Sequence, residues 1–140
     1  MEEIRGPGRH IVAALHTDPA LASRVLAAGW VAAGPARDID EIADLLRQAE
    51  LPPSVLSRSI EVDQSRRAPA VVCLDLMTDP MAPGGNVLHE RCAVVVLHRS
   101  LDMCVRLELS TSDLTAFDDI AGACLEVARR VRPAAEGDVA

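Results

Sequence analysis

The segment VLHERCAVVVLHRSLDMCVRLELS, residues 87–110, decides the fold of this chain. Over residues 101–110, apolar side chains alternate with polar ones, which is the period of a strand with one buried face. Residues 87–98 are rich in Val and Leu, and Arg99 with Ser100 allows a tight reversal between the two runs. The pattern therefore predicts a hairpin of two antiparallel strands, 87–98 and 101–110.

The position of this reversal also predicts which residues face each other, because the numbers of opposed residues then sum to 199. Val94 meets Val105 on the face that we expect to form the core, and Arg91 meets Glu108 on the other face. Opposite charges on opposed residues stabilise a sheet, so the Arg91–Glu108 pair favours this register.

Two further elements flank the hairpin. Residues 68–77 are rich in Val and Leu and predict a first strand, and residues 78–86, with two prolines and a Gly-Gly-Asn run, predict a loop. Residues 113–131 carry an apolar stripe at helical spacing, with Asp113 or Ser112 as the cap. We expect three antiparallel strands with an amphipathic helix on one sheet face.

The N-terminal part shows helical signals instead. Residues 10–16 predict two helical turns, residues 19–33 a helix opened by a proline, and residues 38–51 a helix capped by Asp38. A short helix is expected from Pro52 to residue 60. The prediction is one α+β domain, 1–140: N-terminal helices in a mainly helical segment 1–67, a three-stranded antiparallel β-meander and a C-terminal helix in 68–132, and a frayed tail at 133–140.

Composition and charge exclude several function classes. The chain has 140 residues and a net charge of −7, and all its basic residues are Arg. Such an acidic balance disfavours nucleic-acid phosphates and anionic membranes as partners. Trp30 and Phe117 are the only Trp, Tyr or Phe residues, which disfavours base-stacking platforms. The acidic start and the absence of an apolar run near the ~20 residues of a membrane span predict a cytoplasmic protein.

The four cysteines lie at positions 73, 92, 104 and 124, and no two of them form a C-x-x-C pair. This spacing is not typical of a zinc site, and a reducing compartment disfavours disulfides. We interpret them as small buried side chains, and we expect neither a metal nor a cofactor.

A row of polar residues is the one constellation that suggests catalysis. The predicted register places His89 opposite Ser110 and near Asp75, which is the composition of an acyl-transfer triad. No glycine-flanked nucleophile elbow surrounds Ser110, and mutual hydrogen bonds among these residues explain the row equally well. A small hydrolase or ligand-binding domain that uses the Asp75–His89–Ser110 row, with Arg91 and Glu108 beside it, remains an alternative.

A second alternative is a DNA-binding regulator. Residues 38–60 resemble a helix-turn-helix in pattern, since a proline break separates two apolar helical runs. Ser54, Ser57, Arg58 and Ser59 are the candidate contacts to DNA. The first run is strongly acidic and the second has one Arg, which weakens the case because binding to phosphates needs positive charge.

The second sheet face is too apolar to lie in water. We expect the N-terminal helices, a second copy of the chain or a partner protein to cover it. The preferred hypothesis is a non-catalytic, acidic, cytoplasmic protein that binds another protein as an adaptor, chaperone or regulatory partner and self-associates as a homodimer. The candidate interface residues on this face are Val71, Cys73, Met77, Val95, Leu97 and Cys104.

Overall fold

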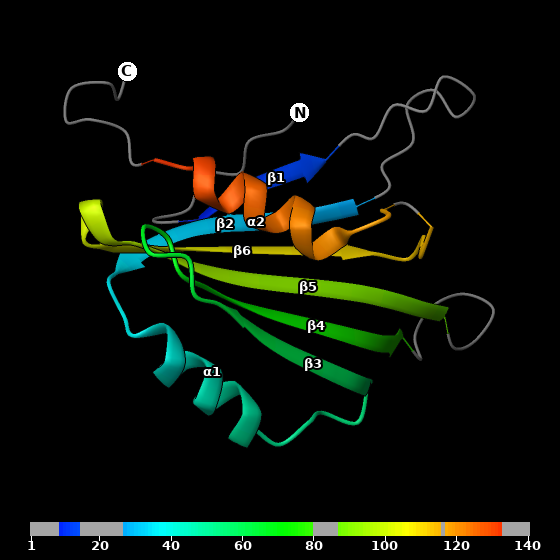
Figure 1. Ribbon diagram of the computed structural model, residues 1–140. Coiled ribbons are helices and arrows are strands. Elements are labelled where there is room, and N and C mark those ends of the chain that lie inside the picture. Colours follow the sequence, from blue (N-terminus) through cyan, green and yellow to red (C-terminus); the bar gives the residue numbers. More distant parts are fainter. Residues whose placement is uncertain (1–8, 15–26, 80–86, 116, 133–140) are drawn as a thin grey trace.

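The computed structural model describes residues 9–14, 27–79, 87–115 and 117–132. They form an antiparallel six-stranded sheet with strand order β1-β2-β6-β5-β4-β3, and the two helices lie on opposite faces of it (Figure 1). The elements are β1 (Arg9–Ala14), β2 (Ala27–Pro35), α1 (Ile39–Gln48), β3 (Val55–Asp63), β4 (Ala70–Asp79), β5 (Val87–His98), the 3-10 turn η2 (Arg99–Leu101), β6 (Met103–Thr111) and α2 (Ile120–Arg130).

The main core lies between α2 and the first sheet face, as the sequence pattern predicts. Val94 of β5 and Val105 of β6 are fully buried there. The stripe of α2 consists of Ile120, Cys124 and Ala128, which recur every fourth residue and therefore share one side of the helix. The α+β class and the packing of a C-terminal helix on the sheet are confirmed.

The register of the β5–β6 hairpin differs from the prediction by two residues. Val94 pairs with Leu107 and Arg91 pairs with Ser110, so that the numbers of opposed residues sum to 201. The cause is the turn, in which η2 is followed by Asp102 in the left-handed conformation, with φ of 48°. Because side chains alternate with a period of two, a shift of two residues keeps every side chain on its predicted face.

Helix α1 covers part of the second sheet face. Asp38 caps it as predicted and accepts a hydrogen bond from the Glu41 backbone N–H at 3.1 Å. Ile39 and Ala43 of α1 are buried against Val71 of β4. The half-buried residues packed around this second cluster are Ile42, Leu46, Ile60, Val62, Val95 and Leu97.

The other N-terminal helices are wrong as predictions. Residues 9–14 form β1, residues 27–35 form β2 and residues 55–63 form β3, while residues 15–26 lie outside the described part of the chain. The Ala-rich run 27–35 fits the period of a helix as well as that of a strand, and it forms a strand because it pairs with β6. Gly29 illustrates that pairing, since a Cβ there would meet the Glu108 carbonyl oxygen. Segment 1–67 is therefore not mainly helical in its described residues.

The start of the C-terminal helix also differs from the prediction. Helix α2 begins at Ile120 with Asp119 as its cap, whose side chain accepts the Gly122 N–H at 2.9 Å, rather than at Asp113. Most of the expected loop 78–86 and the expected tail 133–140 lie outside the described residues. Neither described helix has the length and apolar character needed to cross a membrane.

Candidate functional site

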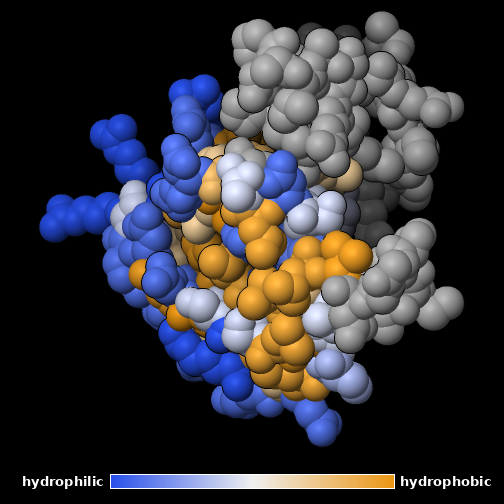
Figure 2. All heavy atoms as spheres, turned by 90° about the vertical axis from the view of Figure 1, so that its right-hand side faces the viewer, coloured by the Kyte–Doolittle hydropathy of each residue, from blue (hydrophilic) through white to orange (hydrophobic). Residues whose placement is uncertain are grey.

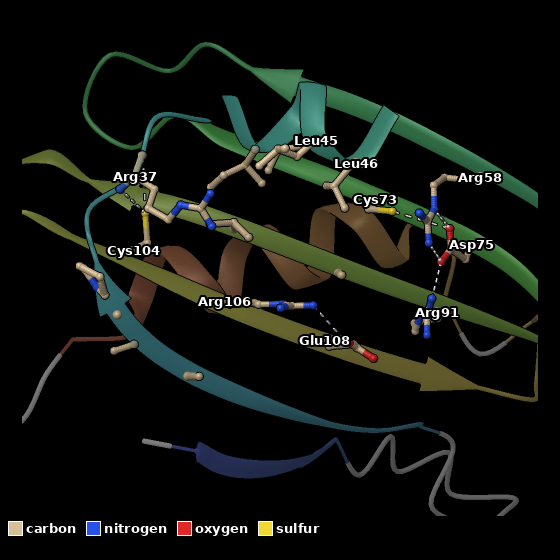
Figure 3. A pocket seen from close by; sticks show the side chains of 18 residues that line it. Arg37, Leu45, Leu46, Arg58, Cys73, Asp75, Arg91, Cys104, Arg106 and Glu108 are labelled. Atoms are coloured by element: carbon tan, nitrogen blue, oxygen red, sulfur yellow. Dashed lines mark hydrogen bonds and ion pairs between the residues drawn. The ribbon is translucent and has the colours of Figure 1, made fainter. Parts of the chain in front are cut away.

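A pocket of about 500 Å³ lies between α1 and the part of the second sheet face that this helix leaves uncovered (Figure 3). We call it the α1 pocket. Ile42, Leu45 and Leu46 of α1 form one wall. The facing wall is the sheet, where small apolar side chains leave the space open. These sheet residues are Ala32 and Ala33 of β2, Val71 and Cys73 of β4, Ala93 and Val95 of β5, and Cys104 of β6.

A buried carboxylate with two arginines closes one end of the pocket (Figure 3). Asp75 is 1% exposed, and it accepts hydrogen bonds from Arg58 Nε at 2.7 Å and Arg58 Nη2 at 2.9 Å. Arg91 Nη2 donates a third, at 2.6 Å. Neighbouring strands present the three side chains to each other, because Arg58, Asp75 and Arg91 are paired residues of β3, β4 and β5.

These contacts set the charge state of the group. Burial by itself raises the pKa of Asp75, but the hydrogen bonds from Arg58 and Arg91 outweigh it, so the pKa lies below the usual value of 3.8. The hydrogen bond with Asp75 likewise raises the pKa of Arg58. Asp75 is therefore an ionised carboxylate with its acceptors occupied, which suits a structural role and not that of a general base.

The two cysteines of the pocket are thiols with local partners. Cys73 Sγ lies 3.6 Å from Asp75 Oδ1, and burial raises its pKa to about 11. Cys104 Sγ accepts the Arg37 backbone N–H at 3.3 Å and so fixes the chain between β2 and α1. A protonated, buried thiol is a poor nucleophile. All four cysteines are buried and free, as the spacing predicts.

The opposite side of the pocket has a looser cationic group. The Arg106 guanidinium carbon lies 5.0 Å from the centre of the Trp30 ring, over its face. Arg106 Nη2 is 3.7 Å from Glu108 Oε2, and the Arg106 side chain is 56% exposed. Arg37 lies at the end beside Cys104, and Arg106 lies between this end and Glu108, toward which its guanidinium points (Figure 3).

The observed register differs from the one that placed the triad residues in a single row. His89 pairs with Met77 and Ser110 pairs with Arg91, so His89 does not stand opposite Ser110. Arg91 takes that place, because the hairpin register is two residues longer than expected. Of the predicted polar residues, Asp75, Arg91 and Glu108 line the α1 pocket, while His89 and Ser110 do not.

The candidate interface residues divide between the helix and the pocket. Val71, Val95 and Leu97 pack around α1, and Val71 and Val95 also line the pocket, as Cys73 and Cys104 do. Met77 is half-buried near the end of the sheet, where it pairs with Val55 and His89. Helix α1 therefore packs on part of the face whose cover was expected to be the N-terminal helices, a second copy or a partner protein.

The helix-turn-helix prediction is wrong, because residues 55–63 form the strand β3 and no second helix follows α1 in residues 49–63. Arg58, its candidate DNA contact, is bound to Asp75. Sequence reasoning missed Arg58, Arg37 and Arg106 as members of one site. A period of two from Arg58 to Val62 was the available signal, since it would have placed Arg58 on the same sheet face as Asp75.

Comparison of the chain with protein-family models, with curated proteins and with solved structures found no match.

Proposed function

We propose that this chain is a non-catalytic binding module and that its binding site is the α1 pocket. The observation that carries the proposal is the pocket itself, about 500 Å³ between α1 and the sheet, with apolar walls and charged groups at both ends. Small-molecule sites in proteins are typically concave, 300–1,000 Å³ in volume, and mostly apolar with few polar groups. A small organic molecule is the occupant that this size and lining favour.

The state of the polar groups supports binding rather than catalysis. Both carboxylate oxygens of Asp75 accept hydrogen bonds, from Arg58 and from Arg91. The pKa of Cys73, raised to about 11, keeps its thiol protonated near neutral pH. A nucleophile needs a free base within hydrogen-bond reach, and neither residue supplies one.

Filling the pocket tests this function. Ala93→Leu adds bulk to the sheet wall, so the affinity for the neutral fluorophore N-phenylnaphthylamine should fall by at least about tenfold, which corresponds to about 1.4 kcal/mol. Fluorescence titration measures it. Val127→Leu is the matched control, because Val127 is 40% exposed on α2, on the opposite face. Equal binding by the wild type and Ala93→Leu would place the fluorophore elsewhere.

A second candidate, docking of a partner protein, is favoured by a different surface. Figure 2 faces the end of the sheet where β3 and β5 begin and shows apolar side chains gathered there. Four exposed apolar residues belong to this end, and we call them the end patch: Leu51, Leu56, Val87 and Leu88, each 38–56% exposed. Exposed apolar patches mark protein interfaces when they are continuous.

Self-association through the end patch has a direct test. If a second copy docks there, sedimentation velocity at micromolar concentration should show a dimer that Leu56→Asp converts to a monomer, because a buried carboxylate without a partner is costly. Leu101→Asp is the control, since Leu101 is 41% exposed at the opposite end of β5. A wild-type monomer would leave only a different protein as the partner of this patch.

A further inference from the structure

The charges around the α1 pocket indicate the class of molecule that it binds. Four arginines and two acidic residues line it, although the chain as a whole has a net charge of −7. The formal charge of the lining is therefore positive, opposite in sign to that of the whole chain. A cavity with apolar walls and net positive charge raises the local concentration of negatively charged ligands.

The arginines at the two ends are in different states. Arg58 and Arg91 share the carboxylate of Asp75, and their side chains are only 12% and 29% exposed. Arg106 lies over the Trp30 ring, has a loose ion pair with Glu108 at 3.7 Å and is 56% exposed. Within the described residues, no acidic side chain pairs with the Arg37 guanidinium. Arg37 and Arg106 therefore have donor capacity left for a ligand.

The apolar residues that line the middle of the pocket indicate that the ligand also has a hydrocarbon part. Ala93 and Val95 of the sheet line it together with Leu45 and Leu46 of α1, and Figure 3 shows the two leucines on the helix above the sheet. A hydrocarbon body placed between them would lose its contact with water, and burying apolar surface is the main favourable term in such binding. The polar head of the same molecule would reach Arg106 and Arg37.

Glu108 limits the charge that this head carries. It lies on β6 beside Arg106, and its carboxylate would repel a second negative charge in the same place. The N-terminus of α1 offers no additional anion site, because the Asp38 side chain already occupies it. A planar monoanion fits these limits, since the guanidinium fork matches the two oxygens of a carboxylate.

We infer that the α1 pocket binds an amphipathic organic carboxylate, with its hydrocarbon part between α1 and β5 and its carboxylate at Arg106 and Arg37. The inference rests on the proposed binding function of the pocket and adds the class of its ligand.

Titration calorimetry with octanoate, octanol and octylamine tests the inference, because the three probes share a chain and differ in charge. Octanoate should bind, octanol at least about tenfold more weakly, and octylamine not measurably. Arg106→Gln should weaken octanoate binding about tenfold. Arg130→Gln, which removes the same charge from the far face at a residue 78% exposed, should have no effect.

Glu108→Gln gives a result of opposite sign. Removal of the like charge beside Arg106 should tighten octanoate binding several-fold, whereas a merely structural role of Glu108 would weaken it or leave it unchanged. Equal affinity for octanol and octanoate, with both lost in Ala93→Leu, would overturn the carboxylate class and leave the pocket as a neutral site. If no probe binds and N-phenylnaphthylamine also fails to bind, both the inference and the proposed function are wrong.

Discussion

Replacing Asp75 by asparagine is expected to lower the free energy of unfolding by about 3–5 kcal/mol. The physical reason is that Arg58 and Arg91, which are 12% and 29% exposed, would lose their shared buried counter-charge. Urea denaturation measures the change. Asp44→Asn is the matched control, since Asp44 forms an exposed pair with Arg47 at 3.3 Å and should cost less than about 1 kcal/mol.

A double variant protects this prediction against simple misfolding. Adding Arg58→Gln to Asp75→Asn removes one of the two uncompensated cations, so the double variant should be more stable than Asp75→Asn alone. Arg58→Gln alone completes the comparison. If the stability loss of the double variant equals the sum of the losses of Asp75→Asn and Arg58→Gln, the two residues act independently, which would contradict the ion cluster that the distances describe.

The same group gives a pH dependence with a defined sign. Because the folded pKa of Asp75 lies below 3.8, its contribution to stability is present above that value and is lost as the pH falls through the folded pKa. The stability difference between the wild type and Asp75→Asn should therefore be constant near neutral pH and shrink in strong acid. A difference that changes between pH 6 and 8 would assign the effect to another group.

The second large effect is expected in the main core. Leu107→Ala removes a side chain that is 1% exposed beneath α2, and it should cost about 2–5 kcal/mol through lost burial and the cavity left behind. Leu101→Ala makes the same chemical change at a residue 41% exposed and should cost less than about 1 kcal/mol. Denaturant midpoints compare the two, and similar losses would mean that Leu107 is not at the centre of the core.

In the β5–β6 hairpin, sequence periodicity predicted the face of each side chain but not the register. Alternation over residues 101–110 placed Val94, Val105 and Leu107 on one face, and the structure confirms that face. The register was wrong because the backbone conformation of Asp102 decides the length of the turn, and periodicity contains no information about it. The predicted sheet face of each side chain was still right, because a shift of two residues keeps every side chain on the same face.

The candidate site was less accessible to sequence reasoning than the core. Asp75 and Arg91 could be grouped from strand parity, but Arg58 lay in a segment read as helix. Strand β2 was also predicted as helix, because its Ala-rich sequence fits a helix as well as a strand. Its pairing with β6 joins residues at least 68 positions apart, and such long-range contacts override local propensity.

The most direct test of the central claim, that the α1 pocket is the binding site, is a map of backbone amide chemical shifts of the ¹⁵N-labelled chain with N-phenylnaphthylamine. The account predicts the largest changes at Leu46 of α1 and at Ala93 and Val95 of β5, all of which line the pocket. The amides of α2, on the other face of the sheet, should not move. Changes confined to α2, or to the end patch, would contradict it.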